Sequence, residues 1–108
     1  MSAPAEIDVA TLAAQLAEGD GPVLLDVRED WEHQLVALPD ALHVPMEQVQ
    51  ARLASLPRDV PLVVYCHHGG RSAHVTELLR AQGFDQASNL AGGIDAWARQ
   101  IDTSLPRY

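Results

Sequence analysis

The sequence contains no lysine, and its seven arginines are outnumbered by fifteen aspartates and glutamates, which gives a formal net charge of -8 at pH 7. A surface of this charge repels phosphate groups, so we expect neither nucleic acid nor an anionic membrane as a partner. No stretch of the sequence approaches the roughly 18 apolar residues of a membrane span. The first residues, Met1 to Glu6, have neither the basic nor the apolar region of a signal peptide. These absences together predict a soluble protein of the cytoplasm.

Cysteine occurs once in the sequence, at Cys66. A single cysteine excludes an internal disulfide, which agrees with a reducing compartment. A chain of 108 residues with 47% hydrophobic content suits one domain whose core needs neither disulfides nor a structural metal. We therefore expect one domain over 1–108, with its core at about 6–100 and an irregular segment over 101–108.

Apolar runs alternate with amphipathic segments along the chain. We expect helices over 9–17, 47–56, 72–82 and 94–99, and strands over 23–27, 42–44, 61–65 and 87–89. Asp8 is suited to cap the first of these helices, and Gly83 to end the third. Strands that are covered on both faces lose the polar alternation of half-exposed strands. Because strands alternate with helices, the sequence predicts an α/β fold with a mainly parallel sheet.

Cys66 lies at the end of the strongest predicted strand, and parallel sheets bind ligands at the carboxyl ends of their strands. The loop over 66–71 joins this strand to the next helix. Gly69 and Gly70 allow positive φ, so successive N–H groups can form a nest for an anion. The helix N-terminus and Arg71 add positive charge. We therefore expect a nucleophilic Cys66 thiolate with a pKa below about 8.5. The alternative is a buried, unreactive structural cysteine.

Four short segments, taken in their order along the chain, form a set of motifs. They are Leu-Asp-Val-Arg-Glu over 25–29, Leu-Pro-Asp-Ala-Leu-His-Val-Pro over 38–45, Cys-His-His-Gly-Gly-Arg-Ser over 66–72 and Asn-Leu-Ala-Gly-Gly-Ile-Asp-Ala-Trp over 89–97. Together they resemble the motifs of the rhodanese-like sulfurtransferases and cover most of residues 22–99. The resemblance implies a rhodanese-like α/β fold, in which helices cover both faces of a five-stranded, mainly parallel sheet.

One segment departs from the pattern of that family. Members often carry Gly-His-Ile before the central proline, where this chain has Val36-Ala37-Leu38. Valine and alanine avoid positive φ, so we expect a different backbone in this loop.

The resemblance further implies the transfer of sulfane sulfur. A donor such as thiosulfate would load Cys66 as a persulfide, and cyanide or a thiol would then remove the outer sulfur. The substrate-binding residues implied are His67, His68, Gly69, Gly70, Arg71 and Ser72, whose N–H groups would hold the persulfide anion. We expect no cofactor and no metal. Because the chain has no second cysteine, the acceptor must be another molecule.

Three other functions are alternatives to sulfur transfer between small molecules. Cysteine phosphatases of related fold have five residues between cysteine and arginine, whereas four separate Cys66 from Arg71, and the smaller loop favours sulfur. Rhodanese-like recognition modules lack the cysteine altogether. The segment over 102–108 resembles segments found on some adenylating sulfur-carrier enzymes, which suggests a persulfide relay between proteins. The alternative for this segment is that Leu105 and Tyr108 pack on their own domain.

The histidines and Arg71 near the loop have more than one possible role. His67 and His68 lack a fourth ligand at a familiar metal spacing. They would instead line the mouth of the site, where a protonated ring attracts an anionic donor, or lie in solvent. His74, one turn into the following helix, would face the pocket. Arg71 either binds the donor or braces the loop.

Aromatic and charged residues outside the loop are interpreted as structural. Asp26 and Arg28 are expected to form a buried ion pair at a strand end. Trp31 and Trp97 are expected to be packing residues and not platforms for substrate.

Overall fold

The computed structural model describes residues 4–19 and 21–108. Its strands are β1 (Glu6–Ile7), β2 (Val23–Asp26), β3 (Leu42–His43), β4 (Leu62–Tyr65) and β5 (Ala87–Leu90). Its α-helices are α1 (Val9–Ala17), α2 (Asp30–Leu35), α3 (Gly70–Ala81) and α4 (Gly93–Gln100). The strands form one five-stranded sheet in the order β1-β5-β4-β2-β3, and every pair is parallel. The predicted α/β fold is therefore confirmed.

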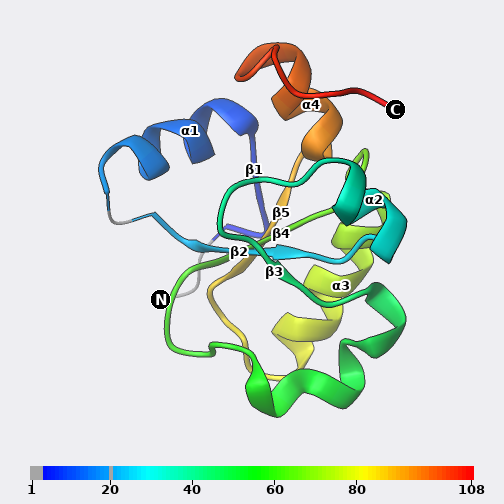
Figure 1. Ribbon diagram of the computed structural model, residues 1–108. Coiled ribbons are helices and arrows are strands. Elements are labelled where there is room, and N and C mark those ends of the chain that lie inside the picture. Colours follow the sequence, from blue (N-terminus) through cyan, green and yellow to red (C-terminus); the bar gives the residue numbers. More distant parts are fainter. Residues whose placement is uncertain (1–3, 20) are drawn as a thin grey trace.

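Helices cover both faces of this sheet (Figure 1). Successive residues of a strand point to opposite faces. Leu25 and Val64 accordingly pack in one core with residues of α3, whereas Leu24 and Val63 pack in a second core with residues of α1 and α4. Each fully buried leucine or valine contributes about 1.5–3 kcal/mol relative to an exposed one. Both faces of the central strands thus stabilise the sheet that carries the site.

The helix expected over 47–56 has a different form. Two 3₁₀ helices, Met46–Gln48 and Gln50–Ser55, occupy this region. Backbone bonds join residues three apart, for example Leu56 N–H to Leu53 O at 3.2 Å. The prediction of one regular helix was wrong because an apolar spacing of three and four residues fits short 3₁₀ turns as well.

Two short elements have no counterpart among the expected helices and strands. β1 has two residues, too few for a periodic pattern. α2 has six residues and begins at a capping box, in which the Glu29 N–H donates to Glu32 Oε1 at 3.1 Å. The spacing of Glu29 and Glu32 is the one sequence signal that could have marked this helix.

The loop that departs from the family pattern is extended at its start. Val36 has φ -161°, and the positive φ of this loop falls on Asp40, at 60°. Aspartate tolerates this conformation better than valine or alanine. At the end of α3, Gly83 has φ 92°, and the Phe84 N–H donates to Leu79 O at 3.0 Å, which confirms the predicted glycine cap.

The strand register brings the functional loops to one edge of the sheet. Asp26 of β2 pairs with Tyr65 of β4, so the residues that follow both strands lie side by side at the carboxyl edge. Cys66 follows β4 directly, at the position that the sequence predicts. In the described part of the chain, no helix has the length and apolar character needed to cross a bilayer.

Candidate active site

Cys66 is buried at the carboxyl end of β4, with only 1% of its surface exposed. Three donors point at its sulfur. The N–H of Gly69 lies 3.1 Å from Sγ, the N–H of Ser72 lies 3.4 Å away and the Ser72 hydroxyl lies 3.3 Å away. The turn after β4 and the first turn of α3 therefore wrap their donors around one sulfur atom, as an anion at this position requires.

These donors change the acidity of the thiol. Burial disfavours the charged thiolate and on its own would raise the pKa of Cys66. The hydrogen bonds from Ser72 and Gly69, together with the nearby charge of Arg71, outweigh burial, so the pKa of Cys66 lies below its ordinary value. The geometry thus supports a thiolate that is shielded from water and held by hydrogen bonds.

The two loop glycines have different backbone conformations. Gly69 precedes α3 with φ 107°, while Gly70 is already the first residue of that helix. The expectation that both glycines use positive φ is therefore wrong for Gly70, and α3 begins two residues earlier than the predicted 72. Only Gly69 turns its N–H toward the sulfur through a conformation that favours glycine.

Ser72 also connects the sulfur to the neighbouring strand. Its hydroxyl lies 2.5 Å from Oδ1 of Asn89 on β5. Asn89 Nδ2 donates in turn to Gly69 O at 3.3 Å and to Glu6 Oε2 at 3.1 Å. Because a hydroxyl has one hydrogen, Ser72 gives it either to Asn89 or to the Cys66 sulfur. The sequence reasoning assigned no role to Asn89, since strand β5 contacts the loop only in the folded chain.

The late Gly-Gly motif fixes the other side of the cysteine loop. At the start of α4, the Ile94 N–H donates to Cys66 O at 2.9 Å and the Asp95 N–H to His67 O at 3.0 Å. A Cβ atom at Gly93 would stand 2.5 Å from both of these carbonyl oxygens. Glycine at this position thus allows α4 to approach the loop closely enough to bond its backbone.

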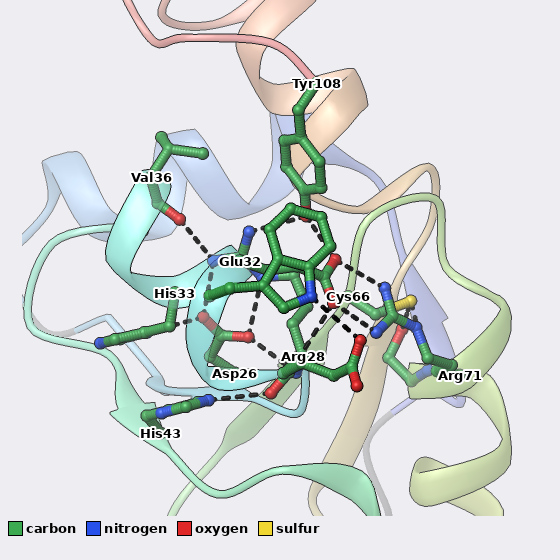
Figure 2. A network of polar contacts seen from close by, with 12 residues as sticks. Asp26, Arg28, Glu32, His33, Val36, His43, Cys66, Arg71 and Tyr108 are labelled. Carbon is green, nitrogen blue, oxygen red and sulfur yellow. Dashed lines mark hydrogen bonds and ion pairs between the residues drawn. The ribbon is translucent and has the colours of Figure 1, made fainter.

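Arg71 is held by a carboxylate from another helix (Figure 2). Its Nη1 lies 2.7 Å from Glu32 Oε1 and its Nη2 lies 2.9 Å from Glu32 Oε2, which is a two-point ion pair. Glu32 is 3% exposed, and the pairing with Arg71 lowers its pKa to about 2. The loop is therefore braced through Arg71, while the charge of Arg71 still favours the Cys66 thiolate. Sequence reasoning missed Glu32, which lies 39 positions from its partner.

The two loop histidines have different environments. His67 is partly buried, and its ring stacks on Tyr108 with a centroid distance of 3.9 Å. Burial, and next the neighbouring His68, lower the pKa of His67, which disfavours the protonated ring. That a protonated histidine attracts the donor stays a prediction. His68 is 68% exposed, with its Nδ1 3.7 Å from Asp95 Oδ2. His74 is exposed on α3.

Two groups of side chains in the described residues have the spacing of metal ligands, Asp26-His33-His43 and His67-His68-Asp95. Asp26 already accepts from the buried Arg28 guanidinium. Asp95 is paired with Arg99 at 2.9 Å and lies 3.7 Å from Arg107. Positive charges next to both carboxylates oppose the binding of a cation, so neither group favours a metal.

The predicted ion pair at the end of β2 is confirmed. Arg28 Nε lies 2.9 Å from Asp26 Oδ1, Arg28 Nη2 lies 2.7 Å from Asp26 Oδ2, and both residues are fully buried. Trp97 is 7% exposed and packs as expected. Trp31 is 56% exposed, donates to Glu29 Oε2 at 3.1 Å and packs edge-on against the ring of Tyr108.

Comparison with known proteins places this geometry in one family. The sequence profile of the "Rhodanese-like domain" matches residues 8–100. The chain belongs to the rhodanese-like family. Among relatives, a "Sulfurtransferase" of Allochromatium vinosum is 39% identical and is aligned over 87% of this chain and 88% of its own. The "Thiosulfate sulfurtransferase GlpE" of Actinobacillus pleuropneumoniae is 32% identical, with 81% of each chain aligned.

In a longer relative, the region similar to this chain is only one part of the protein. The "Probable adenylyltransferase/sulfurtransferase MoeZ" of Mycobacterium tuberculosis is 36% identical over 86% of this chain, but the alignment spans only 24% of MoeZ. Among solved structures, a "Rhodanese-like Domain Protein" of Staphylococcus aureus has a TM-score of 0.83 and 31% identity, covering 97% of this chain and 99% of that one. Family, fold and relatives agree, and this rhodanese-like chain is a sulfurtransferase.

Proposed function

We propose that Cys66 is the nucleophile of this sulfurtransferase and carries the transferred sulfur as a persulfide. The observation that supports this assignment is the set of three donors, from Gly69 and Ser72, at 3.1 to 3.4 Å from a sulfur whose pKa is lowered. The same donors suit a persulfide, because the persulfide is also a sulfur anion on this side chain.

We further propose thiosulfate as a donor, in view of the thiosulfate sulfurtransferase among the relatives. The Cys66 thiolate attacks the outer sulfur of thiosulfate and forms a new S–S bond. The bond between that sulfur and the sulfonate group breaks, and sulfite leaves with the electron pair. Cyanide or a thiolate then attacks the outer sulfur of the persulfide and leaves as thiocyanate or as a new persulfide, which regenerates the Cys66 thiolate. His67, His68, Gly69, Gly70, Arg71 and Ser72 are the proposed substrate-binding residues.

Comparing the turnover of two substrates, thiosulfate and an aryl phosphate, tests this proposal against phosphatase chemistry. We expect the protein to form thiocyanate from thiosulfate and cyanide, and Cys66→Ser to form none. We expect an aryl phosphate to be hydrolysed far more slowly, because four residues rather than five separate Cys66 from Arg71. Turnover of the aryl phosphate equal to that of thiosulfate would overturn the proposal.

A second candidate function is a persulfide relay in which another protein supplies or accepts the sulfur. It is favoured by the MoeZ relative, in which a matching segment is joined to a longer chain. The relay would operate in the cytoplasm, a location we propose from the single cysteine. A Cys66 persulfide that survives excess small thiol for much longer than it survives cyanide would support the relay. Equal rates of loss to both acceptors would contradict it.

A further inference from the structure

The segment over 101–108 is folded against the active site. After α4, the N–H groups of Ile101 and Asp102 both donate to Trp97 O, at 2.8 and 3.0 Å, and turn the chain back (Figure 1). Leu105 and Tyr108 then pack against the core that lies under α1 and α4. This confirms the expectation that the segment packs on its own domain, and it brings Tyr108 to the edge of the cysteine loop.

The Tyr108 ring contacts both the cysteine loop and helix α2. It stacks on His67, with centroids 3.9 Å apart and an angle of 8° between the planes. Its ring meets that of Trp31 edge-on at 5.7 Å and 77°. The side chains around this contact, which include His67, Pro106 and Tyr108, pack too closely to admit a water molecule. The ring therefore joins the residue after Cys66 to the helix that carries Glu32.

The Tyr108 hydroxyl completes the hydrogen bonding of Glu32 (Figure 2). It donates to Glu32 Oε2 at 2.7 Å and accepts from Arg28 Nη1 at 2.8 Å. Burial raises the pKa of Tyr108 to about 12, so the hydroxyl keeps its proton and stays a donor at neutral pH. With the two bonds from Arg71 and one from the Glu29 N–H, the Glu32 carboxylate accepts four donors.

Such a carboxylate is oriented only while its donors are present. A buried charged group that loses one partner carries an unfavourable free energy and shifts toward other partners. If Tyr108 no longer donated, Glu32 could rotate and the Arg71 fork would lose its two-point partner. Arg71 is adjacent to Ser72, which supplies two of the three donors to the Cys66 sulfur.

We propose that Tyr108 is a positioning residue for sulfur transfer. It acts through Glu32, which holds Arg71, and so keeps the donors of the cysteine loop aligned on Cys66. The 101–108 segment is thus part of the machinery that prepares the thiolate. This inference rests on the proposed role of Cys66. It adds a residue that lies outside the four sequence motifs of the family.

The variant Tyr108→Phe tests this role, because it keeps the ring and removes only the hydroxyl. The measurements are the rate of thiosulfate loading and the pH midpoint for alkylation of Cys66 by iodoacetamide, both in the full 108-residue chain. We expect loading to slow by about three- to tenfold, the size of losing one hydrogen bond to a charged group. We also expect the alkylation midpoint to move to higher pH. Ser104→Ala removes a hydroxyl from the same segment outside the site and should match the parent.

The combination with Glu32→Gln tests whether Tyr108 acts through Glu32. Glu32→Gln alone should move the midpoint in the same direction, and in its background Tyr108→Phe should change loading by less than about twofold. The proposal is overturned if Tyr108→Phe has the midpoint and loading rate of the parent, if Glu32→Gln leaves the midpoint unmoved, or if Tyr108→Phe has equal effects in both backgrounds. A parent chain that fails to load sulfur at all would instead contradict the proposed function.

Discussion

Cys66 depends on groups from several elements for its ionisation. Ser72 and Gly69 donate to its sulfur, Arg71 supplies charge, and Asn89 competes for the Ser72 hydroxyl hydrogen. The cysteine, the loop and the arginine were all expected from local sequence, because a strand end, a glycine turn and a helix start are adjacent in the chain. The roles of Asn89, Glu32 and Tyr108 were not expected, because tertiary contacts alone bring them to the loop.

Replacement of Ser72 tests whether its hydroxyl supports the thiolate. Ser72→Ala removes the donor 3.3 Å from the Cys66 sulfur, and we expect alkylation of Cys66 at neutral pH to slow by about three- to tenfold. Ser55→Ala is a matched control, since the Ser55 hydroxyl donates to Arg52 O on an exposed 3₁₀ helix. If Ser72→Ala is alkylated at the parent's rate, the hydroxyl serves Asn89 alone.

At the scale of secondary-structure elements, close approach of α4 to the cysteine loop depends on one glycine. Gly93 has φ 60°, and a Cβ there would lie 2.5 Å from Cys66 O and from His67 O. Both the backbone conformation and the contact oppose any larger residue. The Gly-Gly motif therefore has a structural reason that is visible only once both elements are in place.

Gly93→Ala should destabilise the protein, and urea unfolding measures the effect. We expect a loss of about 2 kcal/mol or more, since the carbonyl oxygens are backbone atoms that cannot move aside cheaply. Gly70→Ala is the control: a Cβ at Gly70 has nothing within 4 Å, and the position is helical. A Gly93→Ala protein as stable as Gly70→Ala would show that the loop adapts and that the close approach is unimportant.

Elements were predictable where their signals are local. Helix α1 was expected at its observed bounds, because the Asp8 cap and the apolar spacing lie within the segment itself. The expected strands match β2 to β5 within one or two residues, whereas β1 was not expected. The short α2 escaped prediction, since its buried Glu32 is explained by Arg71 from another element. The extent of the domain, 1–108 with a core at about 6–100, stays a prediction.

At the scale of the whole molecule, buried ion pairs make the free energy of unfolding depend on pH. The pKa of Glu32 is about 2 in the folded protein against 4.5 for an ordinary glutamate. A carboxyl group with a lowered pKa binds protons more weakly in the folded state than in the unfolded state. Its contribution to stability is therefore complete above pH 4.5 and is lost as the pH falls toward 2. Burial alone would raise the pKa of Asp26, but the hydrogen bonds from Arg28 and His33 outweigh it, so the pKa of Asp26 is also lowered. Its contribution to stability is likewise lost as the pH falls.

Glu32→Gln should therefore weaken the dependence of stability on pH. The free energy of unfolding, measured by urea at a series of pH values, should fall less steeply for this variant than for the parent as the pH drops from 4.5 toward 2. At neutral pH the variant should be less stable, because Arg71 loses its charged partner. Parallel curves for variant and parent would contradict the folded-state pairing of Glu32 with Arg71.

The central claim is that Cys66 carries the transferred sulfur, and intact-mass measurement after incubation with thiosulfate tests it most directly. We predict that the parent chain gains the mass of one sulfur atom, that cyanide removes this mass and yields thiocyanate, and that Cys66→Ser gains nothing. No gain in the parent with any sulfane sulfur donor, or an equal gain in Cys66→Ser, would contradict the account.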